Sequence, residues 1–307
     1  MIQQSNNSSE SPQTNFKKVS FLGLGVMGYP MAGHLSRAGF DVTVYNRTPS
    51  KSERWVQEFS GQSAPTPAEA AKDADAVLLC VGNDQDIREV LNGADGAFNT
   101  LKAGSLVIDH TTASATVARE MAQLAADKQA DFIDAPVSGG QAGAENGVLS
   151  IMCGGSQAAY DRAQPLLTAY GKTIERMGET GAGQLSKMVN QICIAGLLQG
   201  LSEALAFGER ANLDMDKVLK VISNGAAGSW QLSNRGQTML ERSFDFGFAV
   251  DWMRKDLGLV LDEAKNNGAL LPVTALVDQF YAEVQQMGGE RWDTSSLIQR
   301  LNQPDAK

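Results

Sequence analysis

A glycine pattern near the beginning of the chain is typical of a phosphate-binding turn. The motif G-x-G-x-x-G lies at the end of the β-rich run Val19–Leu24 and before the helical run Met31–Ala38. The first glycine of such a motif permits a tight turn, the second lets the backbone approach a pyrophosphate, and the third lets helix and strand pack closely. A bare glycine triplet can also be a plain turn, but this one lies within a strand–turn–helix unit. We therefore expect a dinucleotide to bind at Gly23, Leu24, Gly25, Val26, Met27 and Gly28.

The residues after the second β-rich run, Val42–Asn46, bear on which dinucleotide binds. NAD-preferring sites often place an acidic residue about 20 positions after the glycines. Here the corresponding residues are Asn46, Arg47 and Thr48, and none is a carboxylate. Arg47 can pair with a 2′-phosphate and Thr48 can donate a hydroxyl to it, although an arginine in a surface turn has the same sequence. The segment predicts NADP as the cofactor, with NAD possible.

A lysine in an apolar stretch is the second candidate for chemistry. Residues 181–213 contain no proline and many helix formers, which predicts one helix of about 30 residues, roughly 40 Å long. Lys187 lies there, with Asn190 and Gln191 on the same face at i+3 and i+4. Residues 192–198 are all apolar or glycine, so we expect this part of the helix to be buried on all sides. Because burial disfavours its charge, such a lysine either extends to solvent or has a function.

A glycine-rich segment follows a later β-rich run, Phe132–Pro136. Ser138, Gly139 and Gly140 stand at the carboxyl end of an expected parallel strand, where open α/β sheets bind their ligands. Their hydroxyl and unhindered amides can hold a substrate carboxylate. A plain glycine-rich connection is the alternative.

The order of β-rich and helical runs predicts two domains. From Phe16 to about Gly178 the two kinds of run alternate, which predicts a doubly wound parallel sheet with helices on both faces. After Gly181 the strand pattern largely disappears and helical runs follow one another. We expect a disordered tail over residues 1–15, an α/β domain over 16–180 and an all-α domain over 181–302.

The composition is ordinary for a soluble globular protein and argues against several partners. Of 307 residues, 43% are apolar and 20% are charged. The net charge of −9, without a basic cluster, argues against nucleic acid and anionic membranes. Cys80, Cys153 and Cys193 show neither metal-ligand spacing nor a disulfide framework, so we expect no metal and buried, reduced thiols in a cytoplasmic protein. No uninterrupted apolar run reaches the roughly 18 residues of a membrane span.

Four motifs, taken together and in order, carry a family resemblance. The segments FLGLGVMGYPMAGHL (21–35), DAPVSGG (134–140), GAGQLSKMVNQ (181–191) and MRKDLGL (253–259) resemble those of the β-hydroxyacid dehydrogenase family. That family includes 3-hydroxyisobutyrate dehydrogenase, tartronate semialdehyde reductase and the glyoxylate/succinic semialdehyde reductases. The resemblance implies a Rossmann-type domain, a long interdomain helix and a helical domain for substrate binding and oligomerisation. It also implies NAD(P)-dependent oxidation of a small hydroxy acid or reduction of the matching semialdehyde.

The resemblance assigns roles to individual residues. Lys187 matches the family's catalytic lysine, a general acid in reduction and a general base in oxidation, and Asn190 matches the polar residue one turn beyond it. Ser138, Gly139 and Gly140 match the loop that holds the substrate carboxylate. The further cofactor contacts that it implies are Val81, Gly82, Thr112 and Lys255.

The chain also departs from the family pattern. Gly82 replaces a common proline, residues 110–112 read His-Thr-Thr where Ser-Thr is common, and Gln191 occupies a place where some members have asparagine. We do not expect the general acid to be either histidine, His34 or His110.

Three other functions are compatible with this architecture. Imine reductases share it but usually lack a lysine at the place of Lys187, and loss of that lysine would also mark a non-catalytic NADP-binding module. A complete 6-phosphogluconate dehydrogenase would need a longer helical domain. We therefore favour the dehydrogenase. Because the helical domain is apolar, we also expect a homodimer or homotetramer.

Overall fold

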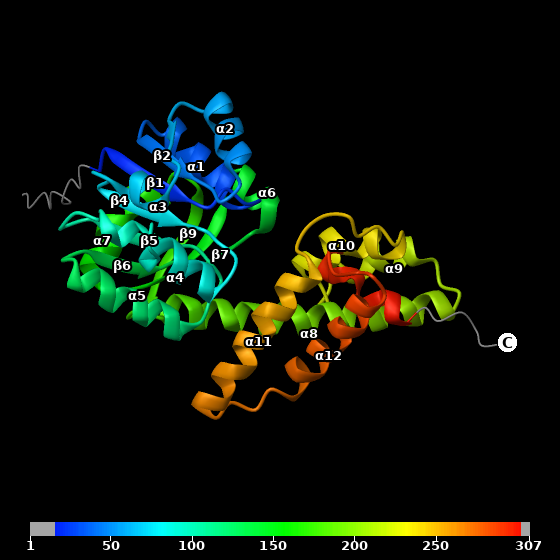
Figure 1. The fold of residues 1–307 in the computed structure, drawn as a ribbon. Coiled ribbons are helices and arrows are strands. Elements are labelled where there is room, and N and C mark those ends of the chain that lie inside the picture. The colour runs from blue at the N-terminus through cyan, green and yellow to red at the C-terminus, as the bar shows by residue number, and fades with distance from the viewer. Residues whose placement is uncertain (1–15, 302–307) are drawn as a thin grey trace, which may run out of the picture. The chain divides into compact units, whose positions relative to one another are not determined.

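The computed structural model describes residues 16–301 (Figure 1). The expected disordered tail, residues 1–15, lies outside the described residues. The chain divides into two compact units, with the division between Gln184 and Leu185.

A nine-stranded sheet organises the first unit. Its strands are β1 (Lys18–Leu22), β2 (Asp41–Tyr45), β3 (Gln62–Ser63), β4 (Ala76–Leu79), β5 (Leu106–Asp109), β6 (Asp131–Asp134), β7 (Val137–Ser138), β8 (Leu149–Gly154) and β9 (Gly171–Gly178). Six of them run parallel in the order β3-β2-β1-β4-β5-β6, the strand order of dinucleotide-binding folds. β8 pairs antiparallel with both β6 and β7, and β9 pairs parallel with β8.

Helices cover both faces of this sheet. They are α1 (Gly28–Arg37), α2 (Pro49–Glu58), α3 (Pro67–Ala71), α4 (Asp84–Asn92), α5 (Ala115–Asp127), α6 (Gly140–Glu145) and α7 (Gln157–Leu167), with a 3₁₀ turn η1 (Ala97–Asn99). Successive strand residues point to opposite faces, so Phe21 packs with α1, α2 and α7 while Leu22 packs with α3, α4 and α5. Both faces are apolar for this reason, and the carboxyl ends of the parallel strands share one edge.

The second unit is helical. It contains most of α8 (Ala182–Arg210), then α9 (Met215–Ile222), α10 (Trp230–Leu240), α11 (Val250–Asn267), α12 (Pro272–Gln286) and the 3₁₀ segment η2 (Thr294–Leu301). One core cluster joins α8, α11 and α12 around Leu198 and Leu257, and a second joins α8, α10 and η2 around Leu205 and Met239. The predicted fold class, a doubly wound Rossmann-type sheet followed by helices that begin with a long one, is confirmed.

Two expectations about α8 and the cysteines are wrong. Cys193 is exposed and Leu197 is 38% exposed, so residues 192–198 are not buried on all sides. The reason is that α8 packs on α11 and α12 through one side only, by residues such as Ala195 and Leu198. Of the thiols only Cys153 is buried, and Cys80 is partly exposed.

Helix α8 also bears on the expectation that no segment spans a membrane. Among residues 16–301 it is the one helix whose length and hydropathy would allow a span, and half of its apolar 18-residue segment is buried inside the protein. A core helix of a folded domain meets the same two criteria, so this observation is weak evidence for a span.

Candidate active site

The loop between β1 and α1 has the geometry that a dinucleotide requires. Gly23 has φ +99°, and a Cβ there would lie 2.3 Å from the Cys80 carbonyl oxygen. A Cβ on Gly28 would lie 2.0 Å from the Gly23 carbonyl oxygen, so this position also requires glycine. A Cβ on Gly25 would meet no described atom within 4 Å. The loop is therefore closed toward the protein and open at Gly25, where a pyrophosphate can approach the start of α1.

Asn46 ties this loop to the turn after β2. Its side-chain Oδ1 accepts a hydrogen bond from the Leu24 amide at 2.8 Å, and its Nδ2 donates to the Thr48 carbonyl at 3.0 Å. The Arg47 side chain is 85% exposed and pairs with Asp86 of α4 at 3.1 Å. Thr48 precedes α2, and its hydroxyl makes no capping hydrogen bond with that helix. The predicted phosphate-binding residues therefore lie beside the glycine loop.

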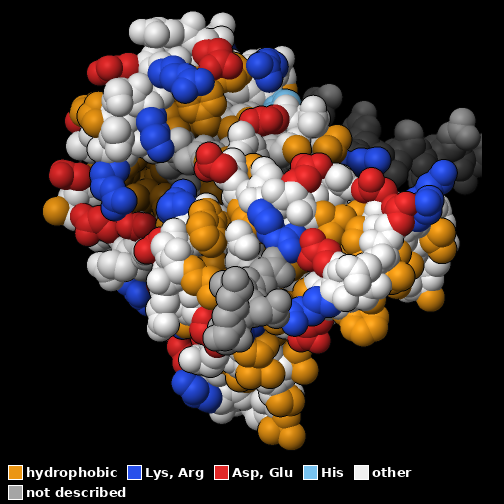
Figure 2. Space-filling view, turned by 90° about the vertical axis from the view of Figure 1, so that its right-hand side faces the viewer, with side chains coloured by type: hydrophobic (Ala, Val, Ile, Leu, Met, Phe, Trp, Pro, Cys, Tyr) orange, Lys and Arg blue, Asp and Glu red, His pale blue; other side chains and the backbone are white. Residues whose placement is uncertain are grey.

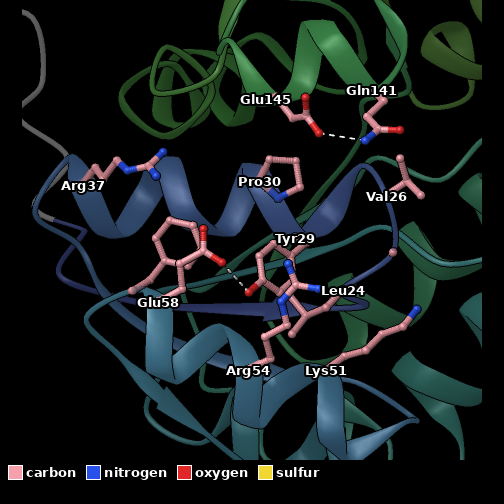
Figure 3. A pocket seen from close by; sticks show the side chains of 12 residues that line it. Leu24, Val26, Tyr29, Pro30, Arg37, Lys51, Arg54, Glu58, Gln141 and Glu145 are labelled. Atoms are coloured by element: carbon pink, nitrogen blue, oxygen red, sulfur yellow. Dashed lines mark hydrogen bonds between the residues drawn. The ribbon is translucent and has the colours of Figure 1, made fainter. Parts of the chain in front are cut away.

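A groove of about 480 Å³ opens beside the same loop (Figure 3). Its walls come from α1, α2 and α6, and its lining includes Leu24, Gly25 and Val26 of the glycine loop. Lys51 and Arg54 project from α2 into its lining, and the sequence reasoning did not single them out. Their signal was present, because the two cations lie one helical turn apart just after Thr48.

The loops after β4 and β5 supply the other predicted cofactor contacts. The Val81 amide donates to the Thr111 hydroxyl at 3.0 Å, which fixes the backbone next to Gly82. Thr111 is buried, whereas Thr112 is only half-buried. Thr111 therefore has a structural role, and Thr112 stays the predicted contact to the cofactor.

The Ser138 segment approaches the glycine loop through a helix that the sequence reasoning missed. Gly139 and Gly140 have φ values of +134° and +62°, and α6 begins there. Gln141 and Glu145 of α6 line the same groove as Gly25 (Figure 3). The predicted carboxylate loop and the predicted cofactor loop are therefore neighbours within the first unit.

Buried polar groups anchor the first turn of α8 inside the first unit. The Asp134 carboxylate at the end of β6 accepts the Gly181 amide at 2.7 Å and the Gln184 amide at 2.9 Å. The Gln184 side chain accepts from the Ala113 amide at 3.0 Å and donates to the Thr111 carbonyl at 2.7 Å. Burial raises the pKa of Asp134 to about 6, and the bound amides oppose this rise. These contacts determine where α8 begins.

The contacts of the two histidines indicate structural roles. His110 Nδ1 lies 2.7 Å from the Ala135 carbonyl oxygen, which can only accept, so Nδ1 carries the proton. Its Nε2 then accepts from the Tyr170 hydroxyl at 2.8 Å, and burial lowers the pKa of His110 to about 4. His34 Nε2 lies 3.0 Å from the Ala144 carbonyl oxygen, in a contact between α1 and α6.

The second unit holds Lys187 in a buried charged cluster. Lys187 is 8% exposed, and burial lowers its pKa to about 8, with Asp256 opposing this shift and Lys255 adding to it. Asp256 is 1% exposed; its Oδ1 lies 3.1 Å from Lys255 Nζ, and its Oδ2 accepts from Gln191 Nε2 at 2.6 Å. Asn190 Nδ2 donates to Gln191 Oε1 at 2.8 Å. A lysine in this state can gain and lose a proton near neutral pH.

Asp256 is the member of this cluster that the sequence reasoning did not select. Its only local signal is an acid directly after Arg254 and Lys255 in the segment MRKDLGL. In the second unit Asp256 contacts Lys255 and Gln191, and its charge acts on Lys187. The other predicted site residues belong to the first unit.

Two family models together match nearly all of the described chain. Residues 18–178 match the NAD-binding domain of 6-phosphogluconate dehydrogenase. Residues 181–301 match the model described as the NAD-binding part of NADP-dependent 3-hydroxyisobutyrate dehydrogenase.

Individual relatives match over similar lengths. An uncharacterized oxidoreductase from Shewanella frigidimarina is 59% identical, covering 92% of this chain and 98% of the relative. The 2-hydroxy-3-oxopropionate reductase of Escherichia coli is 35% identical, covering 92% and 97%. A crystal structure of 3-hydroxyisobutyrate dehydrogenase from Salmonella typhimurium has a TM-score of 0.82 at 32% identity, covering 92% and 99%.

Proposed function

Because this chain belongs to the β-hydroxyacid dehydrogenase family, whose members are NAD(P)-dependent oxidoreductases, we propose that it interconverts a small carboxylate-bearing aldehyde and its hydroxy acid. The family assignment confirms the resemblance of the four motifs. The observation that carries the proposal is the buried Lys187, whose pKa is lowered to about 8 by burial. The substrate class is that of 3-hydroxyisobutyrate or a semialdehyde, in keeping with the names of the relatives from Escherichia coli and Salmonella typhimurium.

Lys187 is the general acid and base of this reaction. The nicotinamide supplies or accepts the hydride when the cofactor is bound. Lys187 gives a proton to the carbonyl oxygen in reduction and takes one from the hydroxyl in oxidation. Its lowered pKa of about 8 keeps both protonation states accessible in the cell's pH range. A lysine at its usual pKa of about 10.4 would be a poor base there.

Other residues orient the substrate. The Ser138 hydroxyl and the backbone amides of Gly139 and Gly140 hold the carboxylate, which aligns the carbonyl carbon for hydride transfer. The Cβ position of Gly140 has no described atom within 4 Å, so the backbone there is open to a ligand. Asn190 orients Lys187 or holds the substrate oxygen.

The cofactor of this enzyme is NADP(H), with NAD(H) as a weaker alternative. Arg47 and Thr48 bind the 2′-phosphate, and Lys51 and Arg54 add positive charge in the adjoining groove. No carboxylate stands where an NAD-preferring site binds the ribose hydroxyls. The predicted contacts of Val81, Gly82, Thr112 and Lys255 complete this assignment.

The active protein is a cytoplasmic homodimer or homotetramer. Apolar side chains are exposed at the start of α12, where Leu270 is 91% and Val273 is 60% exposed. Figure 2 shows hydrophobic side chains gathered at the lower tip of the visible face, at the height of the α11–α12 connection in Figure 1. Phe207 near the end of α8 is 72% exposed. Apolar surface of this kind is typical of a contact between copies.

Replacing Lys187 by methionine tests the proposal. The substitution keeps length and apolar packing while it removes the ammonium, so kcat for aldehyde reduction should fall about 10²–10⁴-fold. Binding of NADPH, followed by cofactor fluorescence, should stay within a few-fold of wild type. Lys217→Met, at an exposed lysine of α9, is the matched control and should change neither. If the Lys187→Met protein keeps most of its kcat, Lys187 is structural and the proposed mechanism is wrong.

The same assays separate the alternatives. A panel of aldehydes with and without a carboxylate, together with cyclic imines, is offered to the wild-type protein with NADPH. Turnover of imines alone would indicate an imine reductase. Tight NADPH binding without turnover of any compound would indicate a non-catalytic binding module. The buried lysine argues against both.

A further inference from the structure

Asp256 lies at the centre of the charged cluster in the second unit. We propose that Asp256 is the shared counter-ion of Lys187 and Lys255, and that Gln191 holds its carboxylate so that Lys187 stays positioned and charged for proton delivery. Asp256 is thus a positioning residue that acts through Lys187. This inference rests on the general acid/base role proposed above for Lys187.

The two carboxylate oxygens of Asp256 have different partners. Oδ2 accepts from Gln191 Nε2 at 2.6 Å, and Gln191 lies one helical turn after Lys187 on the same face of α8. Oδ1 lies 3.1 Å from Lys255 Nζ, yet it makes no aligned hydrogen bond with any described residue. A buried carboxylate oxygen in this state is costly unless a second donor approaches. The ammonium groups of Lys255 and, less strongly, of Lys187 are the charges that act on this carboxylate.

The cluster contains two lysines but only one carboxylate, so both lysines compete for the same negative charge. The ammonium of Lys255 pairs with the Asp256 carboxylate, and the ammonium of Lys187 interacts with the same carboxylate electrostatically. The charged groups that act on Lys187 are Asp256 and Lys255, both of α11. Burial and Lys255 lower the pKa of Lys187, while Asp256 alone opposes them. Removing the charge of Asp256 would leave the two unfavourable effects unopposed. Lys187 would then lose its proton at a lower pH, so a smaller fraction of it could donate a proton in reduction.

Gln191 has the geometry of a fixed support for this carboxylate. Its amide nitrogen is committed to Asp256, and its amide oxygen accepts from Asn190 at 2.8 Å. Asn190 therefore donates to Gln191, and Gln191 in turn donates to Asp256. A glutamate at position 191 would set a second carboxylate against the first, which explains why a neutral amide is suited to this position.

Asp256→Asn is the direct test, because it removes the charge while keeping the shape and the hydrogen bond to Gln191. The pKa of Lys187 should drop below about 8, and the pH above which aldehyde reduction declines should drop with it. Above that pH, kcat should be lower about tenfold for each unit by which the pKa falls. Asp251→Asn is the matched control: Asp251 also lies on α11 and accepts a glutamine amide, from Gln285 at 2.6 Å, outside the cluster.

A second readout does not depend on turnover. Lysine side chains are labelled, and the titration of Lys187 in the cofactor-free protein is followed by NMR, with its signal assigned from Lys187→Met. The Asp256→Asn protein should show a lower midpoint, Asp256→Glu should restore part of the shift, and Asp251→Asn should show none. An unchanged Lys187 midpoint in a folded Asp256→Asn protein would overturn the inference.

Two further outcomes keep the inference separate from the proposed function. If the midpoint falls but the wild-type protein reduces no aldehyde, the counter-ion role stands and the proposed reaction is wrong. If Asp256→Asn does not fold, Gln191→Leu replaces it, since it releases the carboxylate without removing it. Lys187 should then titrate at a changed midpoint, and an unchanged midpoint would equally overturn the inference.

Discussion

Arg47 is the residue on which cofactor choice depends most directly. Its guanidinium is exposed and pairs with Asp86 at 3.1 Å. Exposed pairs of this kind contribute about 0–1 kcal/mol, so a doubly charged phosphate can readily replace Asp86. We predict that Arg47→Asp lowers the ratio of kcat/KM for NADPH to that for NADH at least tenfold, as measured with one aldehyde at fixed ionic strength.

Asp86→Asn is the control for this prediction. It keeps the Arg47 cation while removing its partner, so the preference for NADPH should stay the same or increase. A wild-type protein that already prefers NADH tenfold would contradict the assignment of the Asn46–Thr48 segment.

At the scale of single residues, the sequence predicts groups that stand out locally and misses groups whose meaning depends on a distant partner. Lys187 is recognisable because it interrupts an apolar helix. Asp256 is not, because its partner Gln191 lies 65 positions away on another helix. Next to Lys255 in the sequence, the acid resembles an ordinary surface charge. Only packing makes it the centre of the cluster.

At the scale of elements, the start of α8 depends on one buried carboxylate. Asp134 accepts the amide of Gly181, just before the helix, and that of Gln184 in its first turn. A Cβ on Gly183 or Gly154 would collide with the oxygens of Asp134. In Asp134→Asn one oxygen becomes an NH₂ group, which faces an N–H donor. We predict that the variant loses about 1–3 kcal/mol of unfolding free energy, measured by urea denaturation.

Asp131→Asn provides the comparison on the same strand. Asp131 lies at the start of β6 and pairs with Arg162 at the surface. Losing that pair should cost about 0–1 kcal/mol. Equal losses in the two variants would contradict the anchoring role of Asp134.

The elements that the sequence missed share a physical cause. The strands β3 and β7 have two residues each, too few for a period of two to be visible. Helix α6 has six residues and contains two glycines, which are poor helix formers. It forms because its buried residues Gly143 and Ala144 pack between β8 and α1, which is tertiary information.

At the scale of the whole molecule, the order of the units and of the parallel strands follows from the alternation of β-rich and helical runs. The strand order β3-β2-β1-β4-β5-β6 places the glycine loop beside the crossover between β1 and β4. The reversal at β8 was not predicted, because local sequence does not distinguish parallel from antiparallel partners. The roles predicted for the two domains stay predictions that the Lys187 and Arg47 variants test.

Asp109 makes the stability of the folded chain depend on pH. It is fully buried at the end of β5 beside Asp134 of β6, and its Oδ1 accepts the Thr111 amide at 2.8 Å. Its Oδ2 has no hydrogen-bond partner among the described residues. Burial, with repulsion from Asp134, raises the pKa of Asp109 from 3.8 to about 7. The folded chain therefore binds more protons than the unfolded chain between these pH values.

The sign of the effect follows from this excess of bound protons. The contribution of Asp109 to the free energy of unfolding should fall as pH rises from about 4 to 7, by up to about 4 kcal/mol at 1.36 kcal/mol per unit of pKa. His110 acts in the opposite direction, because burial lowers its pKa to about 4. Since the wild type and Asp109→Asn both contain His110, its effect cancels when the two proteins are compared. Relative to the wild type, Asp109→Asn should therefore gain about 2–3 kcal/mol between pH 5 and pH 8, measured by urea denaturation. A difference that does not change with pH would mean that Asp109 titrates normally, and that its carboxylate is solvated in the folded protein.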